Sequence, residues 1–274
     1  MVKTLITVAP TGAESDKSVV SALPVTQNEL VVTAQECEAA GAAVIHVHVR
    51  DENARPTLDV AQLADRVAAI REATDLIVQL STGGAVTDSF DARLKVLDAA
   101  PDACSLTCGT VNFGDDVFMN PWGFIKDLYQ LTQERKVVPE FELFDMGQVA
   151  TLQRLLAELG PPAGGHVHCD LVMGVPGGMP GNLPTLAAAV AALPPGATWA
   201  ATGIGRTTLP VLLSALAADG HLRVGMEDTI TFSRGRPVAR NAELVERAAQ
   251  LAIISQRPPM SPPEAREFLG IPVA

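Results

Sequence analysis

The sequence predicts an α/β fold: a (β/α)8 TIM barrel that forms a single domain over residues 1–274, with a C-terminal helical tail at about 239–274. Short apolar segments alternate with amphipathic helical patterns along the chain, which is typical of βα units around a parallel sheet. Eight such units fit a chain of 274 residues, and no linker or change in composition divides it. A doubly wound open sheet is the alternative fold, because hydrophobic periodicity alone does not exclude it.

The predicted strands are short runs of apolar and β-branched residues, as expected for strands buried on both faces. They lie at residues 5–9, 43–49, 76–80, 103–107, 137–143, 167–174, 198–201 and 222–226. Helical patterns lie between them, for example at 28–40, 61–73 and 147–159. The tail contains a helix at 241–255, a proline-rich segment at 257–263 and a short final helix. This tail either covers the barrel or reaches a neighbouring subunit.

Composition narrows the class of protein. Hydrophobic residues make up 47% of the chain, enough for a large core, and the net charge of −11 argues against a nucleic-acid partner. The four cysteines form no Cys-x-x-Cys pair and suggest no disulfide framework. The first residues show no signal-peptide pattern, and even the Ala- and Leu-rich stretch near 183–193 is broken by Pro184 and Pro194. We therefore expect a cytoplasmic enzyme with no membrane partner.

His46 and His48 are the most informative residues, because they lie two positions apart at the carboxyl end of the second predicted strand. Side chains at positions i and i+2 of a strand point to the same face. Two imidazoles that project together suit two ligands of one transition metal ion. Histidines in apolar strands are often ordinary core residues, but two on one face at the entrance to a polar loop favour a metal.

Glu227 is the predicted third ligand. It follows the eighth predicted strand, and in a barrel it lies at the same rim as the two histidines. Two histidines and a carboxylate with an open position suit catalytic zinc, with non-haem iron(II) as the competitor. The open position would bind and polarise a substrate carbonyl. Taken alone, Glu227 also fits a helix N-terminal carboxylate or a simple salt bridge, and its place at the rim favours the metal.

Other polar residues collect at the carboxyl ends of the predicted strands, where TIM barrels carry their chemistry. Arg223 precedes Glu227 by four residues, and Asp228 follows it directly. An arginine held against an aspartate fixes an anionic substrate or assists proton transfer, although an ordinary ion pair fits nearly as well. The Gly-rich segments at 81–84 and 203–206 could hold phosphate or carboxylate groups, but neither is a nucleotide-binding fingerprint.

A second pair with the same spacing, His166 and His168, lies at the start of the sixth predicted strand. The amino-terminal end of a barrel strand belongs to the face that contributes stability, opposite the active site. We therefore predict that these two histidines are structural, and the same argument applies to His221 before the eighth strand.

The ordered set of motifs resembles the β-keto acid cleavage enzymes, the family of the 3-keto-5-aminohexanoate cleavage enzyme. The resemblance covers nearly the full length. It lies in residues 6–13, 41–51, 81–84, 105–113, 139–145, 174–178, 199–205, 223–228 and 241–245. It implies a (β/α)8 barrel that binds one Zn²⁺, usually in a homotetramer, with His46, His48 and Glu227 as the zinc ligands.

The resemblance also implies a reaction: a β-keto acid and acetyl-CoA give acetoacetate and a new acyl-CoA by retro-Claisen cleavage. Arg223 and Asp228 match the catalytic pair of the family. The positions that match its substrate-binding residues are Glu14, Ser81, Thr110, Asn112 and Glu142, with Thr82 as a possible replacement for Ser81. We expect Arg223 to stabilise charge, because arginine is a poor base at its normal pKa.

Two other functions are compatible with the residues. The first is a zinc hydrolase on the same barrel, in which Asp228 activates a metal-bound water and acetyl-CoA is not needed. The second is a metal-binding or scaffold protein with a vestigial site, which the intact polar set at many strand ends disfavours. Glu14 and Glu142 could hold a cationic group on the keto acid, or they could simply bond loop amides and hydroxyls.

Overall fold

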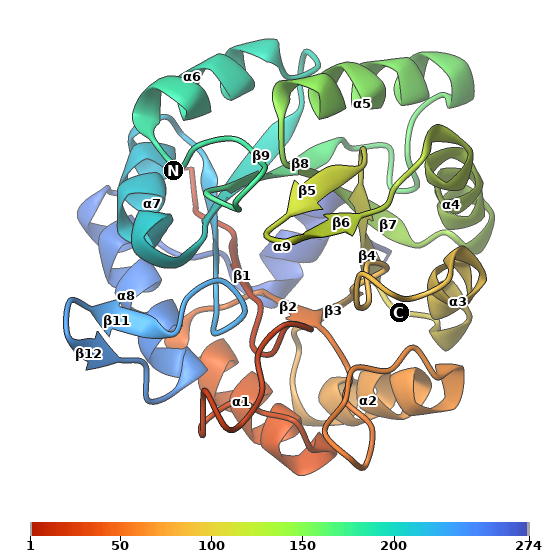
Figure 1. The fold of residues 1–274 in the computed structure, drawn as a ribbon. Helices are drawn as coiled ribbons and strands as arrows, with labels where there is room; N and C mark the ends of the chain where they lie inside the picture. The colour runs from red at the N-terminus through yellow and green to blue at the C-terminus, as the bar shows by residue number, and fades with distance from the viewer. Residues whose placement is uncertain (1, 273–274) are drawn as a thin grey trace.

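A computed structural model describes residues 2–272, and their strands form one closed parallel barrel in the order β1-β10-β9-β8-β7-β4-β3-β2 (Figure 1). The (β/α)8 prediction is confirmed, and the open doubly wound sheet is excluded, because β1 pairs with both β2 and β10. The barrel strands are β1 (Ile6–Val8), β2 (Val44–Val47), β3 (Ile77–Leu80), β4 (Ala103–Thr107), β7 (Val138–Leu143), β8 (His168–Met173), β9 (Thr198–Gly203) and β10 (His221–Val224).

Every predicted strand segment overlaps one barrel strand, and the differences lie at the ends. The last predicted strand, 222–226, begins one residue earlier in the structure and ends at Val224. Gly225 explains that end, because its backbone packs against Ala9, the residue directly after β1. A Cβ at Gly225 would lie 1.8 Å from the carbonyl oxygen of Ala9, so only glycine allows this approach.

The helices surround the barrel and pack their apolar sides on the outer face of the strands. They are α1 (Gln27–Ala40), α2 (Val60–Ala73), α3 (Phe90–Lys95), α4 (Trp122–Arg135), α5 (Met146–Leu159), α6 (Leu183–Ala192) and α7 (Thr208–Ala217), with the 3₁₀ turns η1 (Val96–Ala99) and η2 (Gly205–Thr207). The helices predicted at 28–40, 61–73 and 147–159 are α1, α2 and α5, and each begins one residue earlier than predicted. Their N-cap side chains, Thr26, Asp59 and Asp145, mark the true starts. Within residues 2–272, no helix has the length and apolar character needed to cross a membrane.

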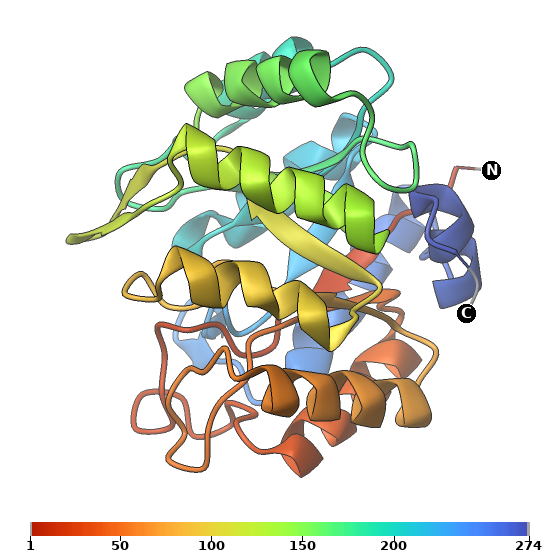
Figure 2. The same cartoon turned by 90° about the vertical axis from the view of Figure 1, so that its right-hand side faces the viewer.

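Two small hairpins were not predicted from the sequence. One consists of β5 (Val111–Phe113) and β6 (Asp116–Phe118), and the other of β11 (Thr231–Ser233) and β12 (Arg236–Pro237). The β5–β6 hairpin projects beyond the carboxyl ends of the barrel strands (Figures 1 and 2). Phe113 anchors it, with its ring centroid 6.1 Å from that of Phe144 beside β7. Three-residue strands with an acidic tip lack the hydrophobic alternation from which strands are predicted.

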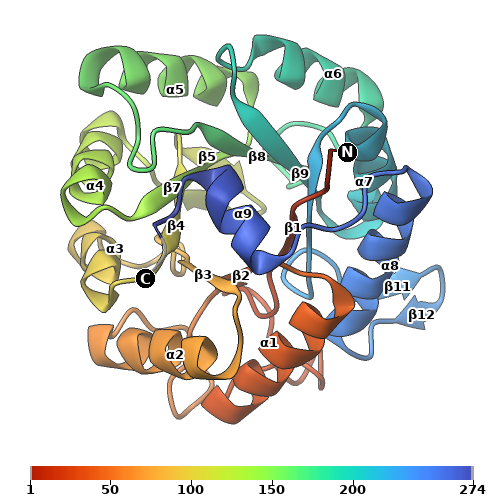
Figure 3. The same ribbon diagram turned by 180° about the vertical axis from the view of Figure 1, so that it is seen from behind.

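The C-terminal tail covers the barrel, which was one of the two predicted possibilities. Helix α8 (Asn241–Ile254) lies beside α1 on the outside. Helix α9 (Pro262–Leu269) crosses the amino-terminal mouth of the barrel (Figure 3). Ala265 and Leu269 of α9 join an apolar cluster with Leu5 and Val44 at the amino ends of the strands. One mouth of the barrel is therefore plugged by the chain's own C-terminal helix.

Above the apolar cluster that α9 covers, the interior of the barrel is polar. The buried side chains of its strands include Thr7, His46, Gln79, Ser105, Thr107, Glu140, Glu142, His168, Asp170, Thr202, His221 and Arg223. The apolar core lies instead between the strands and the surrounding helices. Buried polar groups require hydrogen-bond partners, and most of these side chains contact one another across the barrel. A barrel that could be filled with aliphatic layers therefore holds a connected polar network.

Candidate active site and metal centre

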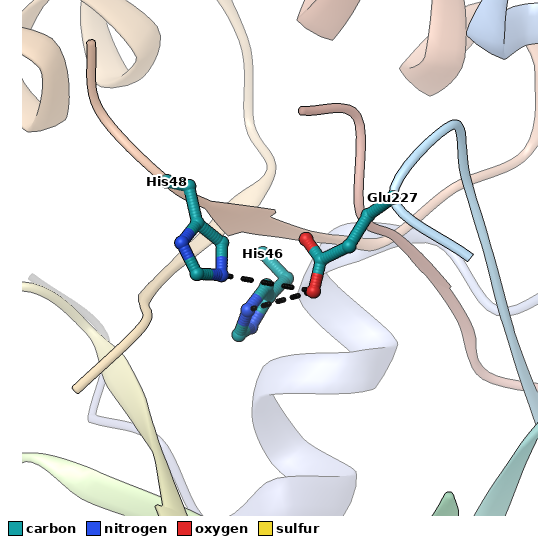
Figure 4. Close-up of side chains that lie close together, drawn as sticks. All are labelled: His46, His48 and Glu227. Atoms are coloured by element: carbon teal, nitrogen blue, oxygen red, sulfur yellow. Dashed lines mark ion pairs between the residues drawn. The ribbon is translucent and has the colours of Figure 1, made fainter. Parts of the chain in front are cut away.

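His46, His48 and Glu227 come together at the carboxyl-terminal mouth, as the sequence predicts (Figure 4). Their ligand atoms lie within 4.8 Å of one another. Oε1 of Glu227 is 3.8 Å from Nε2 of His46 and 3.6 Å from Nε2 of His48. His46 lies on β2, His48 directly follows it, and Glu227 comes from the loop after β10.

Two glycines allow Glu227 to reach the histidines. Gly225 brings the loop against β1, where the Glu227 amide donates to the carbonyl of Ala9 at 3.2 Å. Gly12 has a φ of +65°, and a Cβ there would lie 2.8 Å from Cγ of Glu227. Glycine adopts this left-handed conformation without the steric cost that other residues have. The turn after β1 is thus shaped to leave room for the Glu227 side chain.

The three side chains have the chemistry of a transition-metal site. Nδ1 of His46 lies 2.6 Å from Oε1 of Gln79, so this nitrogen donates and Nε2 keeps its lone pair. Burial lowers the pKa of His46 to about 4, which favours the neutral imidazole that binds metals. Oε2 of Glu227 is buried without a hydrogen-bond partner. Two available imidazole nitrogens and an unsatisfied carboxylate oxygen fit a divalent ion such as Zn²⁺.

Arg223 on β10 lies in the centre of the polar network. Its guanidinium contacts Glu227 directly and lies 3.1 Å from both Glu142 and Asp228, with Asp170 at 3.7 Å. Burial alone would raise the pKa of Glu227, but the charge of Arg223, together with both histidines, holds it well below its usual range. Arg223 therefore keeps the proposed metal ligand ionised.

Asp228 combines a fixed oxygen with an unpaired one. Oδ1 accepts from Nη2 of Arg223, while Oδ2 is buried without a partner. Burial raises the pKa of Asp228 to about 7, although Arg223 opposes the shift. Asp170 behind it behaves similarly, since burial raises its pKa to about 7. One arginine thus faces several carboxyl groups, and a carboxyl that exchanges its proton near neutral pH suits acid–base chemistry.

A cavity of about 460 Å³ opens above these residues. Most of the predicted site residues line it: Glu14, His46, His48, Ser81, Glu142, Arg223, Glu227 and Asp228. Thr82, the possible replacement for Ser81, is directed elsewhere, because its hydroxyl donates to the carbonyl of Ser105 at 2.7 Å. Neither Thr110 nor Asn112 lines the cavity. Thr110 accepts instead from the amide of Asn120 at 2.9 Å, at the base of the β5–β6 hairpin.

Two features that support this site were not predicted from the sequence. The first is the β5–β6 hairpin, which contributes Phe113, Asp115 and Asp116 to the lining. The second is Arg50, whose Nη2 donates to the carbonyls of Gly12 at 2.6 Å and Ser15 at 2.8 Å. Arg50 thereby holds the loop that carries Glu14. Arg50 could have been identified from the sequence, because an arginine that follows the histidine motif so closely lies next to the predicted site.

This fold and cavity define a (β/α)8-barrel enzyme with acid–base groups and a metal-type triad at one mouth. A family model described as beta-keto acid cleavage enzyme matches residues 3–271. The chain is 37% identical to the 3-keto-5-aminohexanoate cleavage enzyme of Acetoanaerobium sticklandii, over 99% of both chains. It is 33% identical to the 3-oxoadipate:acetyl-CoA acetyltransferase of Cupriavidus necator, over 98% of this chain and 95% of that one. The chain therefore belongs to the β-keto acid cleavage enzyme family.

A solved structure supports the same fold. The apo structure of ObcA superposes with a TM-score of 0.81 at 18% identity, covering 92% of this chain and 66% of that chain. At this identity the likeness concerns the barrel architecture only.

Proposed function

We propose that this protein is a zinc-dependent β-keto acid cleavage enzyme that condenses a β-keto acid with acetyl-CoA and releases acetoacetate and a new acyl-CoA. One observation carries the proposal: the His46–His48–Glu227 triad and the unpaired oxygen of Asp228 line the same cavity. The acetyl-CoA in the name of the Cupriavidus necator relative supports the choice of co-substrate.

The proposed zinc ligands are the two histidines and Glu227. When bound there, Zn²⁺ would supply Lewis-acid polarisation of the β-ketone and so favour loss of a proton from the adjacent carbon. Gln79 prepares His46 for this ligation, and Arg223 keeps Glu227 ionised. These contacts belong to the protein itself and do not depend on the substrate.

Asp228 acts as the base that takes a proton from C2, the carbon between ketone and carboxylate. C2 then attacks the thioester carbonyl of acetyl-CoA, and CoA thiolate leaves. The thiolate adds to the original ketone carbon, and the bond between that carbon and C2 breaks. This cleavage yields the new acyl-CoA and the carbanion of acetoacetate, which recovers its proton from Asp228. The acetyl group thus replaces the original acyl group on C2, and no other reactant is consumed.

Arg223 holds Asp228 and stabilises negative charge. It stays protonated, because the surrounding carboxylates outweigh the effect of burial and raise its pKa above the usual value. Glu142 fixes the other side of the guanidinium, and Thr107 in turn donates to Glu142 at 2.8 Å. Glu142 is therefore engaged with Arg223, which leaves Glu14 as the more available carboxylate for the substrate.

The lining of the cavity mouth favours a keto acid with a cationic group. Glu14, Asp115 and Asp116 all line the cavity, and the only Lys or Arg among its described lining residues is the ion-paired Arg223. A dicarboxylate would meet like charges there, whereas an amine would be attracted. The Acetoanaerobium sticklandii relative is named for an amino-bearing keto acid. We expect Ser81, which lines the cavity, to donate to the substrate, and Thr110 and Asn112 to act through the hairpin.

The proposed function is tested by an activity assay on protein of known metal content. The substrates are amine-bearing and neutral β-keto acids, each with and without acetyl-CoA. We expect acetoacetate only when acetyl-CoA is present. Turnover without acetyl-CoA would identify the hydrolase instead, and an inactive protein without metal would contradict both. Glu14→Gln should raise KM for the amine-bearing substrate and leave KM for the neutral substrate unchanged.

We also propose that the protein is a cytoplasmic homotetramer. A light-scattering mass other than that of a tetramer would contradict this assembly.

A further inference from the structure

A hydrogen-bonded chain runs beneath the proposed metal centre into the barrel. Oε1 of Gln79 lies 2.6 Å from Nδ1 of His46, and Nε2 of Gln79 donates to Oε2 of Glu140 at 2.7 Å. The three side chains come from β2, β3 and β7, and each is at least 95% buried. Strand register brings the first two together, because His46 and Gln79 are partners in the β2–β3 pair.

The contact with Glu140 shows the direction of this chain. An amide side chain has one accepting and one donating end, and the donating end of Gln79, Nε2, faces Glu140. Because Glu140 accepts from Nε2 of Gln79, the amide oxygen must face His46. That oxygen in turn requires a proton on Nδ1 of His46, which leaves the lone pair on Nε2, the nitrogen nearest Glu227.

We propose that Gln79 and Glu140 are positioning residues that hold His46 in the tautomer and orientation that bind the metal. The inference rests on the proposed zinc site and extends it to two residues with no contact to metal or substrate. Side chains that orient a ligating histidine typically contribute roughly 10–100-fold to metal affinity. Gln79 acts on His46, and Glu140 acts on Gln79.

A simple structural role makes a different prediction. If the chain only satisfied buried polar atoms, its removal would lower stability and leave zinc affinity unchanged. Thr198 provides the control, because its hydroxyl lies 2.7 Å from Nδ1 of His168 at the amino-terminal mouth of the barrel, away from the metal centre. Thr198→Val removes such a bond without touching the metal ligands.

The test measures zinc affinity by competition with a chromophoric chelator, together with the free energy of unfolding. Gln79→Leu should weaken zinc binding by roughly 10–100-fold, whereas Thr198→Val should not change it. If Gln79→Leu does not fold, exchanging the two side chains (Gln79→Glu together with Glu140→Gln) tests the same role. Gln79→Glu alone places two carboxyls together and should bind zinc weakly. Adding Glu140→Gln should restore binding, because the introduced carboxylate then accepts from His46 and from the new amide.

The outcomes separate the inference from the proposed function. A wild-type protein that binds no zinc would contradict the zinc site itself. Stoichiometric zinc in the wild type with unchanged affinity in Gln79→Leu would overturn the positioning role alone. A swap variant that binds zinc no better than Gln79→Glu would overturn it as well.

Discussion

The two mouths of this barrel carry the same motif with different consequences. At the carboxyl-terminal mouth, called the upper mouth below, His46 and His48 (the upper pair) lie beside Glu227 and line the cavity. At the amino-terminal mouth, called the lower mouth, His166 and His168 (the lower pair) share the hydroxyl of Thr198, at 2.6 Å and 2.7 Å. The side view shows the β5–β6 hairpin extending from one end and α9 packed at the other (Figure 2).

Position in the barrel and neighbouring side chains decide what a His-x-His pair does. The lower pair is packed against Phe268 of α9, whose ring lies 5.6 Å from that of His166 and 6.0 Å from that of His168. Glu140 is the carboxylate nearest to His168, at 3.5 Å, but it already accepts from Gln79. Among residues 2–272, only the upper pair belongs to a metal-compatible group.

The largest expected effect concerns catalysis at the upper mouth. Asp228→Asn removes the base without changing size, and we expect kcat/KM to fall roughly 10²–10⁴-fold. Zinc content should stay stoichiometric, because Asp228 is not one of the proposed ligands. Steady-state kinetics with acetyl-CoA, together with metal analysis, measure both. Wild-type rates in this variant would remove Asp228 from the mechanism.

A substitution at the lower mouth should lower the stability of the protein and leave its metal binding unchanged. Leu269→Ala leaves a cavity in the apolar cluster under the barrel, and we expect a loss of about 2–4 kcal/mol in the free energy of unfolding. Zinc affinity should not change. Urea denaturation and zinc competition on the same samples test this. A variant as stable as the wild type would show that α9 is not a structural plug.

A matched pair of glycines tests the shape of the upper mouth. Gly12 and Gly235 both have positive φ, so alanine costs each about 1–2 kcal/mol in stability. Only at Gly12 would the new methyl group collide with Glu227, since Gly235 has open space around it. We expect zinc affinity to fall about tenfold in Gly12→Ala and to stay unchanged in Gly235→Ala. Equal zinc affinity in the two variants would contradict the role given to Gly12.

A pH dependence is expected at the lower mouth. Burial lowers the pKa of His221 to about 3, while an unfolded histidine has a pKa of about 6.5. Between these values the unfolded chain binds a proton that the folded chain excludes, so stability falls as pH drops below 6.5. His221→Asn keeps an acceptor for the amide of Leu5 and removes the titration.

Denaturation between pH 7.5 and pH 5 compares the two proteins. The wild type should lose up to about 1.4 kcal/mol per pH unit more than His221→Asn. Parallel pH profiles would show that His221 is not held neutral in the folded protein.

The sequence predicts the barrel and its rim well, because both depend on local patterns. Each strand is a short apolar run, and the rim is simply the set of residues that follow those runs. His46, His48 and Glu227 could therefore be placed together although they lie about 180 residues apart in the chain. The N-cap residues Thr26, Asp59 and Asp145 would have corrected the helix starts.

The remaining features depend on contacts between distant residues. Nothing in the sequence around Gln79 or Glu140 indicates that they support His46, since this depends on which strands are adjacent and in which register. The β5–β6 hairpin was missed because its strands are short and partly exposed. The family motifs could not reveal that Thr110 lies under the hairpin, away from the cavity.

We propose that His46, His48 and Glu227 form the metal centre and that the lower pair, His166 and His168, does not. Metal analysis of the wild type, Glu227→Gln, His48→Gln and His166→Gln tests it most directly. We predict stoichiometric zinc in the wild type and in His166→Gln, and loss of zinc in Glu227→Gln and His48→Gln. Stoichiometric zinc in Glu227→Gln, or loss of zinc in His166→Gln alone, would contradict the account.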